Sequence, residues 1–129
     1  MEYSGGSDFN GNLKERTKLF SIKLCNTLKT VPYNQVTKNL ITQVVRSGTS
    51  VAANFHAATR ARSIAEYYSK ICIVVEECDE TVLWLDLIIS AKLITTREIE
   101  DLKKEALELL YILASVRKKL KHRINNNLK

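Results

Sequence analysis

VVRSGTSVAANFHAATRARSIAEYYSKICIVVEECDETVLWLDLIIS, residues 44–90, decides the fold of this chain. The stretch contains no proline and a single glycine. Apolar residues recur at steps of three and four on both sides of residues 60–62, which predicts two amphipathic helices. Ser63 followed by Glu66 has the form of a capping box, which begins the second helix. Because the connection is so short, the two helices must run antiparallel.

The residues before this stretch predict one further helix and the first half of the helix that contains residues 44–59. Asn12 with Glu15 begins a helix over roughly 12–30, which Pro32 ends. Its stripe comprises Leu13, Thr17, Phe20, Leu24, Thr27 and Val31. Asn34 is the expected cap of the next helix, which runs to about 59. The stripe of that helix comprises Val36, Leu40, Val44, Ser47, Val51, Phe55 and Ala58.

Two helices follow the turn at 60–62. The first, over 63–92, has a stripe of Ile64, Tyr67 or Tyr68, Ile71, Val75, Cys78, Val82, Leu85 and Ile89. Thr95 with Glu98 predicts the start of the last helix. Its stripe comprises Ile99, Leu102, Ala106, Leu109, Leu113, Val116 and Leu120. We therefore expect an all-α, antiparallel up-down-up-down four-helix bundle over 12–124, with a disordered leader at 1–11 and a frayed tail at 125–129.

The segment RSGTS, residues 46–50, is poor helix-forming sequence. Gly48 costs about 1 kcal/mol relative to alanine inside a helix. Close approach of a neighbouring helix would explain the missing side chain, and a break in the helix is the competing interpretation. A phosphate cradle is disfavoured, because the glycine lies inside a helical pattern and no GxxxxGK[ST] motif is present.

Composition limits the class of protein. No apolar run is long enough to cross a bilayer, and the polar start lacks the form of a signal peptide, so we expect a cytoplasmic protein. Cys25, Cys72 and Cys78 form no CxxC pair and are expected to be reduced thiols used as small core residues. The residues His56 and His122 complete no plausible metal site, so we expect neither metal nor cofactor.

Charge is distributed very unevenly along the chain. Residues 14–70 carry ten bases and two acids, and residues 71–108 carry ten acids and four bases. Residues 117–129 carry six bases and no acid, which is the whole of the net charge of +6. Such polarity favours pairing between helices or between copies of the chain.

A polar line on the second helix faces an acidic line on the third. The first line includes Arg46, Ser50 and Asn54, and the second includes Glu77, Glu80 and Trp84. We expect Arg46 to pair with Glu77 or Glu80, at the bundle edge or across a subunit contact, because the guanidinium binds carboxylates at two points. A plain solvated face is the alternative.

Two basic groups are expected to meet at one end of the bundle. The larger lies near the C-terminus and the smaller at the turn between the second and third helices. We call them together the basic rim: Arg60, Arg62, Lys70, Arg117, Lys118, Lys119, Lys121 and Arg123. If the rim contacts about six phosphates, the logarithm of the binding constant should fall with the logarithm of the salt concentration, with a slope of roughly −0.9 per phosphate. The alternative is a solvated helix C-terminus, where cations are favoured in any case.

Three segments together resemble a known family. They are LKERTK (13–18), VVRSGTSVAANFHAATRARSIAEYYSK (44–70) and VVEECDETVLWLDLIISAKLI (74–94). The chain resembles the small bacterial four-helix-bundle proteins first named for genes within intervening sequences of 23S ribosomal RNA genes. The sequence departs from the usual family pattern at Ala52, Phe55, His56 and Cys78.

The resemblance implies a function that the spacing of residues does not show. Several family members are homopentamers, and the related accessory variability determinant is a basic pentamer that binds nucleic acid and a reverse transcriptase. No catalytic residues are known in the family. We therefore expect a non-enzymatic homo-oligomer, a pentamer, that binds RNA or another nucleic acid through the basic rim. A protein adaptor is the alternative, and an enzyme with an acidic metal site is disfavoured.

Overall fold

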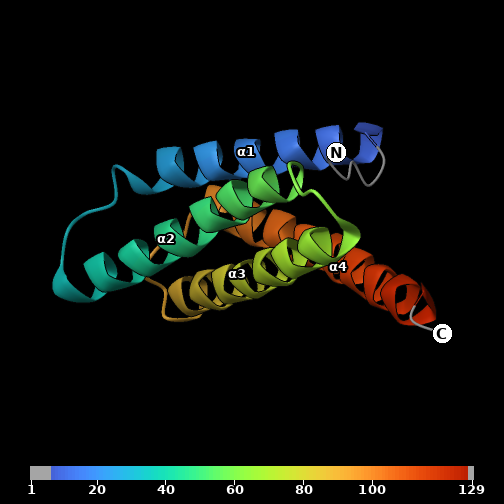
Figure 1. Ribbon diagram of the computed structural model, residues 1–129. Helices are drawn as coiled ribbons and strands as arrows, with labels where there is room; N and C mark the ends of the chain where they lie inside the picture. Colours follow the sequence, from blue (N-terminus) through green and yellow to red (C-terminus); the bar gives the residue numbers. More distant parts are fainter. Residues whose placement is uncertain (1–6, 128–129) are drawn as a thin grey trace.

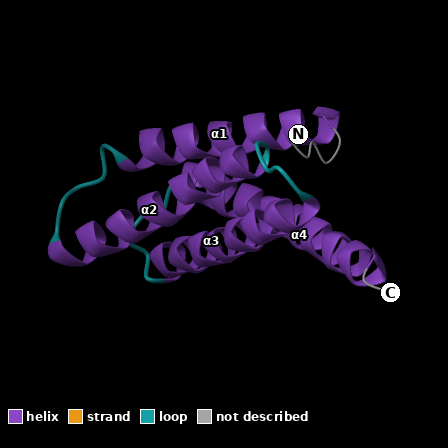
Figure 2. Ribbon diagram, in the orientation of Figure 1, coloured by secondary structure: helices purple, strands orange, loops and turns teal. Residues whose placement is uncertain are grey.

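The computed structural model describes residues 7–127, which form four helices and no strand (Figures 1 and 2). This confirms the predicted all-α, four-helix fold class. The helices are α1 (Ser7–Leu28), α2 (Gln35–Ala58), α3 (Ile64–Ser90) and α4 (Arg97–Asn127).

Each helix packs against two others. The most extensive contacts join α2 to α3 and α3 to α4, and the contact between α1 and α4 is the smallest. Helices α1 and α3 lie across the diagonal of the bundle, where their backbones stay apart and only side chains meet, as those of Asn10 and Tyr67 do. The α1–α2 and α3–α4 connections lie at one end, and the α2–α3 turn lies at the other, towards the ends of the chain (Figure 1).

Side chains from all four helices meet in one core. The predicted stripe residues Phe20, Val44, Ile71 and Leu113 are all buried, one from each helix. Burying a side chain of this size contributes about 1.5–3 kcal/mol, so this core is the main source of stability.

Gly48 lies at a close contact between α1 and α2. Helix α2 continues through this residue, so the prediction of a tight helix contact is confirmed and the predicted alternative of a break is wrong. A Cβ atom at Gly48 would lie 2.3 Å from the Cδ2 methyl of Leu24. The Ser21 hydroxyl donates to the carbonyl oxygen of Gly48 at 3.3 Å. On the α3 side, the buried Thr81 hydroxyl lies 2.9 Å from that of Ser47.

Capping side chains fix three of the helix starts. Asn34 accepts from the amide of Thr37 at 2.9 Å, and Ser63 accepts from that of Glu66 at 3.1 Å, as predicted. The predicted cap Thr95 is wrong by one residue, because Thr96 accepts from the amide of Ile99 at 3.4 Å. Thr96 is the residue directly before α4, and the amide of Ile99 lies three residues after it, which is the spacing of an N-cap bond.

The boundaries at both ends of the bundle differ from the prediction. Helix α1 begins at Ser7, so 7–11 of the predicted leader are helical and Asn12 is no cap. Asn10 is buried and accepts from the Tyr67 hydroxyl at 2.7 Å, a tertiary contact that holds this first turn. Residues 125–127 of the predicted frayed tail continue α4, where Asn126 contacts His122. Residues 1–6 and 128–129 lie outside the described residues.

Three side chains predicted for the core have a different environment. Val36 is 59% exposed, and Thr37, one residue on, is buried in its place. Cys25 is exposed and Cys72 is half-buried, because each lies about 100° around its helix from a buried neighbour. Only Cys78 among the three thiols is a core residue, and burial, with the nearby Asp79 and Glu105, raises its pKa to about 12.

Candidate nucleic-acid interface

The starts of α1 and α3 lie at the same end of the bundle. The hydrogen bond from Tyr67 to Asn10 joins them directly. Arg117 of α4 lies close enough to Tyr68 to affect the pKa of that phenol, which is raised chiefly by a hydrogen bond with Cys72. The start of α3 therefore lies beside both the start of α1 and the last third of α4.

The basic rim falls into two parts that this end brings together. Arg60 and Arg62 are exposed at the α2–α3 turn, and Lys70 is half-buried in the second turn of α3. Arg62 makes a 3.7 Å ion pair with Glu66, which reduces the charge available at that point. Arg117 is half-buried beside α3.

The last turns of α4 carry the greatest charge density. Lys118, Lys119, Lys121 and Arg123 are exposed, while Leu120 between them is 6% exposed and anchors this segment to the bundle. Residues 117–123 contain five Lys and Arg residues and no acid. A helix held in this way presents its cations without the entropic cost of ordering a free tail.

Two residues outside the predicted rim extend it towards α1. Lys14 lowers the pKa of His56, with smaller contributions from burial and Arg60, so three basic groups from separate segments lie near one another. Sequence reasoning missed this group because α1, α2 and the turn contribute one residue each. The surplus of bases over 14–70 was the only available signal.

The polar line on α2 and the acidic line on α3 do meet, within one chain. Arg46 bonds the Glu77 carboxylate at 3.3 Å and also bonds Glu80. The indole Nε1 of Trp84 donates to the same Glu80 carboxylate at 3.2 Å. The predicted pairing is thus an intrachain link between α2 and α3.

Ser50 and Asn54, which were predicted to belong to the polar line on α2, take no part in the link between Arg46 and α3. The side-chain amide of Asn54 donates to the carbonyl oxygen of Ser50 at 2.9 Å, one turn back on the same helix. The Ser50 hydroxyl shares no described hydrogen bond with α3. The described residues contain no group of three or more His, Cys, Asp and Glu side chains placed to hold a metal ion.

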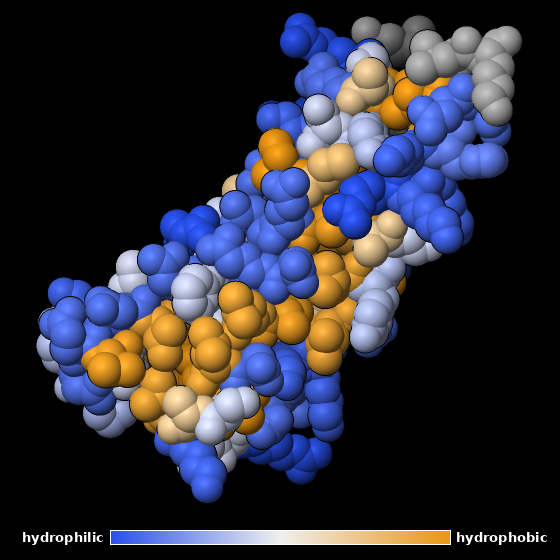
Figure 3. Space-filling view, turned by 90° about the horizontal axis from the view of Figure 1, so that it is seen from below, coloured by the Kyte–Doolittle hydropathy of each residue, from blue (hydrophilic) through white to orange (hydrophobic). Residues whose placement is uncertain are grey.

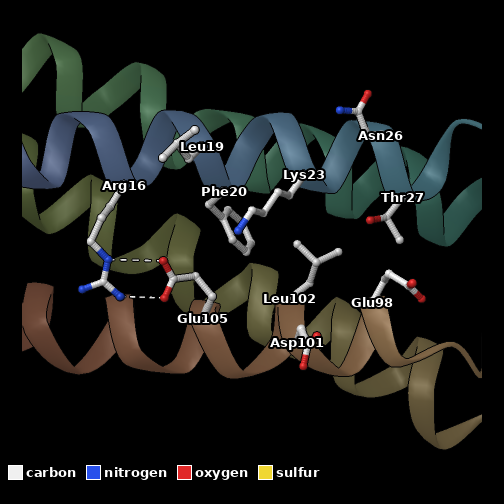
Figure 4. Close-up of a pocket in the computed structure, with 10 residues that line it drawn as sticks. All are labelled: Arg16, Leu19, Phe20, Lys23, Asn26, Thr27, Glu98, Asp101, Leu102 and Glu105. Carbon is white, nitrogen blue, oxygen red and sulfur yellow. Dashed lines mark hydrogen bonds and ion pairs between the residues drawn. The ribbon is translucent and has the colours of Figure 1, made fainter.

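A groove of about 660 Å³ runs between α1 and α4, where the helix contact is smallest (Figure 4). Phe20 and Leu102 point towards each other between the two helices, and Lys23 projects from α1 beside Phe20. Arg16 bridges it with two hydrogen bonds to Glu105, at 2.6 and 3.2 Å, which raise the pKa of the guanidinium. This ion pair fastens α1 to α4 and divides the groove from the basic end.

None of the described helices is both long and apolar enough to span a bilayer. The fold and the charge distribution define a small all-α bundle protein with one strongly basic end. The chain belongs to the 23S rRNA-intervening sequence protein family, whose sequence pattern matches residues 12–115.

A solved structure supports the same assignment. A protein of unknown function from the S23 ribosomal protein family of Bacteroides thetaiotaomicron has a similar crystal structure, with a TM-score of 0.74 and 31% sequence identity. The match covers 82% of this chain and 98% of that chain. No curated protein is significantly similar.

Proposed function

We propose that this protein is a cytoplasmic, non-enzymatic homo-oligomer that binds RNA through its basic end. The observation that carries the proposal is the charge of α4 over 117–123, which is anchored by Leu120 beside the basic turn between α2 and α3. Lys and Arg side chains on an ordered surface release counterions when they contact phosphates, and this drives binding. A pentamer is the assembly that the family resemblance implies.

Catalysis and cofactor binding form no part of the proposal. The Ser47 hydroxyl is engaged with Thr81 and the backbone of its own helix, and burial keeps the Cys78 thiol protonated. Within residues 7–127, neither group is paired with a general base that would activate it as a nucleophile. We infer that the polar groups of the bundle hold its helices together.

Salt dependence of RNA binding tests this function. We expect labelled single-stranded and duplex RNA to bind with a log–log slope of roughly −0.7 to −0.9 for each phosphate contacted, and therefore about −4 to −5 for six. Fluorescence anisotropy over a salt series measures this slope. Absence of RNA binding at low salt would refute the proposal. A protein ligand captured with little salt dependence would instead support the adaptor.

Binding should also depend on pH through His56. In the free protein Lys14, burial and Arg60 lower the pKa of this imidazole below its ordinary value of 6.5. Bound phosphates would offset those positive charges and raise the pKa, so RNA binding takes up a proton and strengthens as pH falls through this range. NMR titration of His56 with and without RNA measures the change.

The His56→Gln variant is the control for this effect. It retains His122, so any pH dependence that disappears in the variant belongs to His56. An unchanged His56 pKa in the complex would place RNA away from the surface that His56 shares with Lys14 and Arg60.

A further inference from the structure

Helix α3 carries an apolar row on the side that faces away from the bundle. Ile73, Leu83 and Leu87 are exposed by 38%, 51% and 39%. With Glu76 and Glu80 they recur at steps of three and four, which is one face of a helix. The view from below shows an apolar band along the length of the molecule (Figure 3). A row of exposed apolar side chains along one helix face is typical of a surface that another protein surface covers.

Acidic residues surround this row. Residues 71–91 contain five acids and no base. Arg46 engages Glu77 and Glu80, whereas Glu76 and Asp79 are exposed and make no ion pair with another residue of 7–127. The surface that would cover the α3 face should therefore be apolar at its centre and basic around it.

The outer face of α1 has this composition. Leu19 and Ile22 are each 45% exposed. Lys18 and Lys29 lie on the same side and are exposed, and neither makes an ion pair with a described residue. Residues 12–30 contain five bases and one acid. Because α1 and α3 occupy diagonal corners of the bundle, one chain cannot bring its own two faces together.

We propose that the outer face of α3 docks on the outer face of α1 of a second copy of this chain. This inference rests on the proposed homo-oligomer and assigns the surfaces that form it. The two surfaces differ, so the contact is heterologous and closes into a ring when the rotation between copies permits. In a ring, equivalent points lie in one plane, so the basic ends of all copies would be at one level. Many weak phosphate contacts would then act together.

Two double variants, each with two glutamine substitutions, test the α3 face and the α1 face separately. One variant carries Leu83→Gln and Leu87→Gln on α3, and the other carries Leu19→Gln and Ile22→Gln on α1. Glutamine keeps helix propensity, adds no charge, and places a polar group where apolar contact is required. Size-exclusion chromatography with light scattering measures the mass of each variant alone and of their equimolar mixture.

We expect each variant alone to be a monomer, and the mixture to form a one-to-one dimer and nothing larger. In the mixture one intact α3 face meets one intact α1 face, and the remaining two faces are both impaired. An α1 variant that keeps the wild-type mass, or a mixture that stays monomeric, would overturn the assignment of surfaces. A wild-type chain that is itself monomeric at high concentration would instead refute the proposed homo-oligomer.

A matched control uses exposed apolar residues elsewhere. Tyr33, in the connection before α2, and Val36, in the first turn of α2, are 74% and 59% exposed. The double variant Tyr33→Gln and Val36→Gln should keep the wild-type mass. Circular dichroism and urea unfolding of all variants establish that a change in mass reflects lost association and not a lost fold. A control that also becomes monomeric would overturn the specific pairing of α1 with α3.

Discussion

Replacing Gly48 by valine is expected to lower the free energy of unfolding by about 2–3 kcal/mol, since overpacking of a filled core carries a cost of this size. The new Cβ would lie 2.3 Å from Leu24 Cδ2, and Phe20 and Thr81 stand 3.5 and 3.7 Å away. Leu24 is fully buried and has little room to move. Urea unfolding measures the change, and the melting temperature should fall by roughly 10 °C for a chain of this size.

Two further variants make this result specific. Gly11→Ala lies in α1, where an added Cβ meets nothing within 4 Å, and should raise stability by up to about 1 kcal/mol through helix propensity. Leu24→Ala alone should lower stability by about 2–5 kcal/mol because it leaves a cavity. Combined with Gly48→Val, it should cost less than the sum of the two, because the valine fills that cavity. Strict additivity would show that Gly48 does not mark the contact between α1 and α2.

Replacing four cations of α4 with glutamine is expected to remove most RNA affinity. The changes are Lys118→Gln, Lys119→Gln, Lys121→Gln and Arg123→Gln. Each phosphate contact contributes about 0.7–0.9 decade of affinity at about 0.1 M salt, so the loss reaches roughly 10³-fold or slightly more if all four contact RNA. The magnitude of the salt slope should fall by about three to four. Anisotropy titrations at several salt concentrations measure both quantities.

The matched control removes the same charge from other exposed lysines. Lys23 lies beside the groove between α1 and α4, Lys38 and Lys92 lie near the α1–α2 and α3–α4 connections, and Lys104 is in the second turn of α4. Changing all four to glutamine leaves the same net charge as the α4 variant. We expect less than a tenfold loss of affinity in this control, because general electrostatic attraction changes equally in both variants. Equal losses would show that RNA is attracted by net charge and has no site at the basic end.

Local chemistry made several features predictable. Asn34 and Ser63 cap helices because their side chains reach amides three residues ahead, a geometry that the sequence alone contains. The pairing of Arg46 with the acids of α3 followed from two polar lines on neighbouring antiparallel helices. The close helix contact at Gly48 could be predicted because few structural reasons account for a glycine inside a helix.

Most of the errors in the prediction concern residues whose environment depends on contacts between distant segments, whereas the cap at Thr95 is a local error of one residue. Helix α1 starts early because Tyr67, more than fifty residues away in sequence, holds Asn10. The apolar periodicity was compatible with a buried side chain at Val36 or at a neighbouring position. In the packed bundle the buried side chain is that of Thr37. Cys25 is exposed although the residue before it is fully buried.

The sequence by itself determined the fold class, the positions of the turns and the concentration of charge, because helix periodicity, capping and composition act over a few residues. Only the tertiary structure decided which charges are neighbours and which apolar side chains remain uncovered. Lys14, His56 and Arg60 lie near one another only because the start of α1 packs beside the end of α2 and the turn that follows it. The outer faces of α1 and α3 can be identified only when it is known which side chains of both helices are buried in the core.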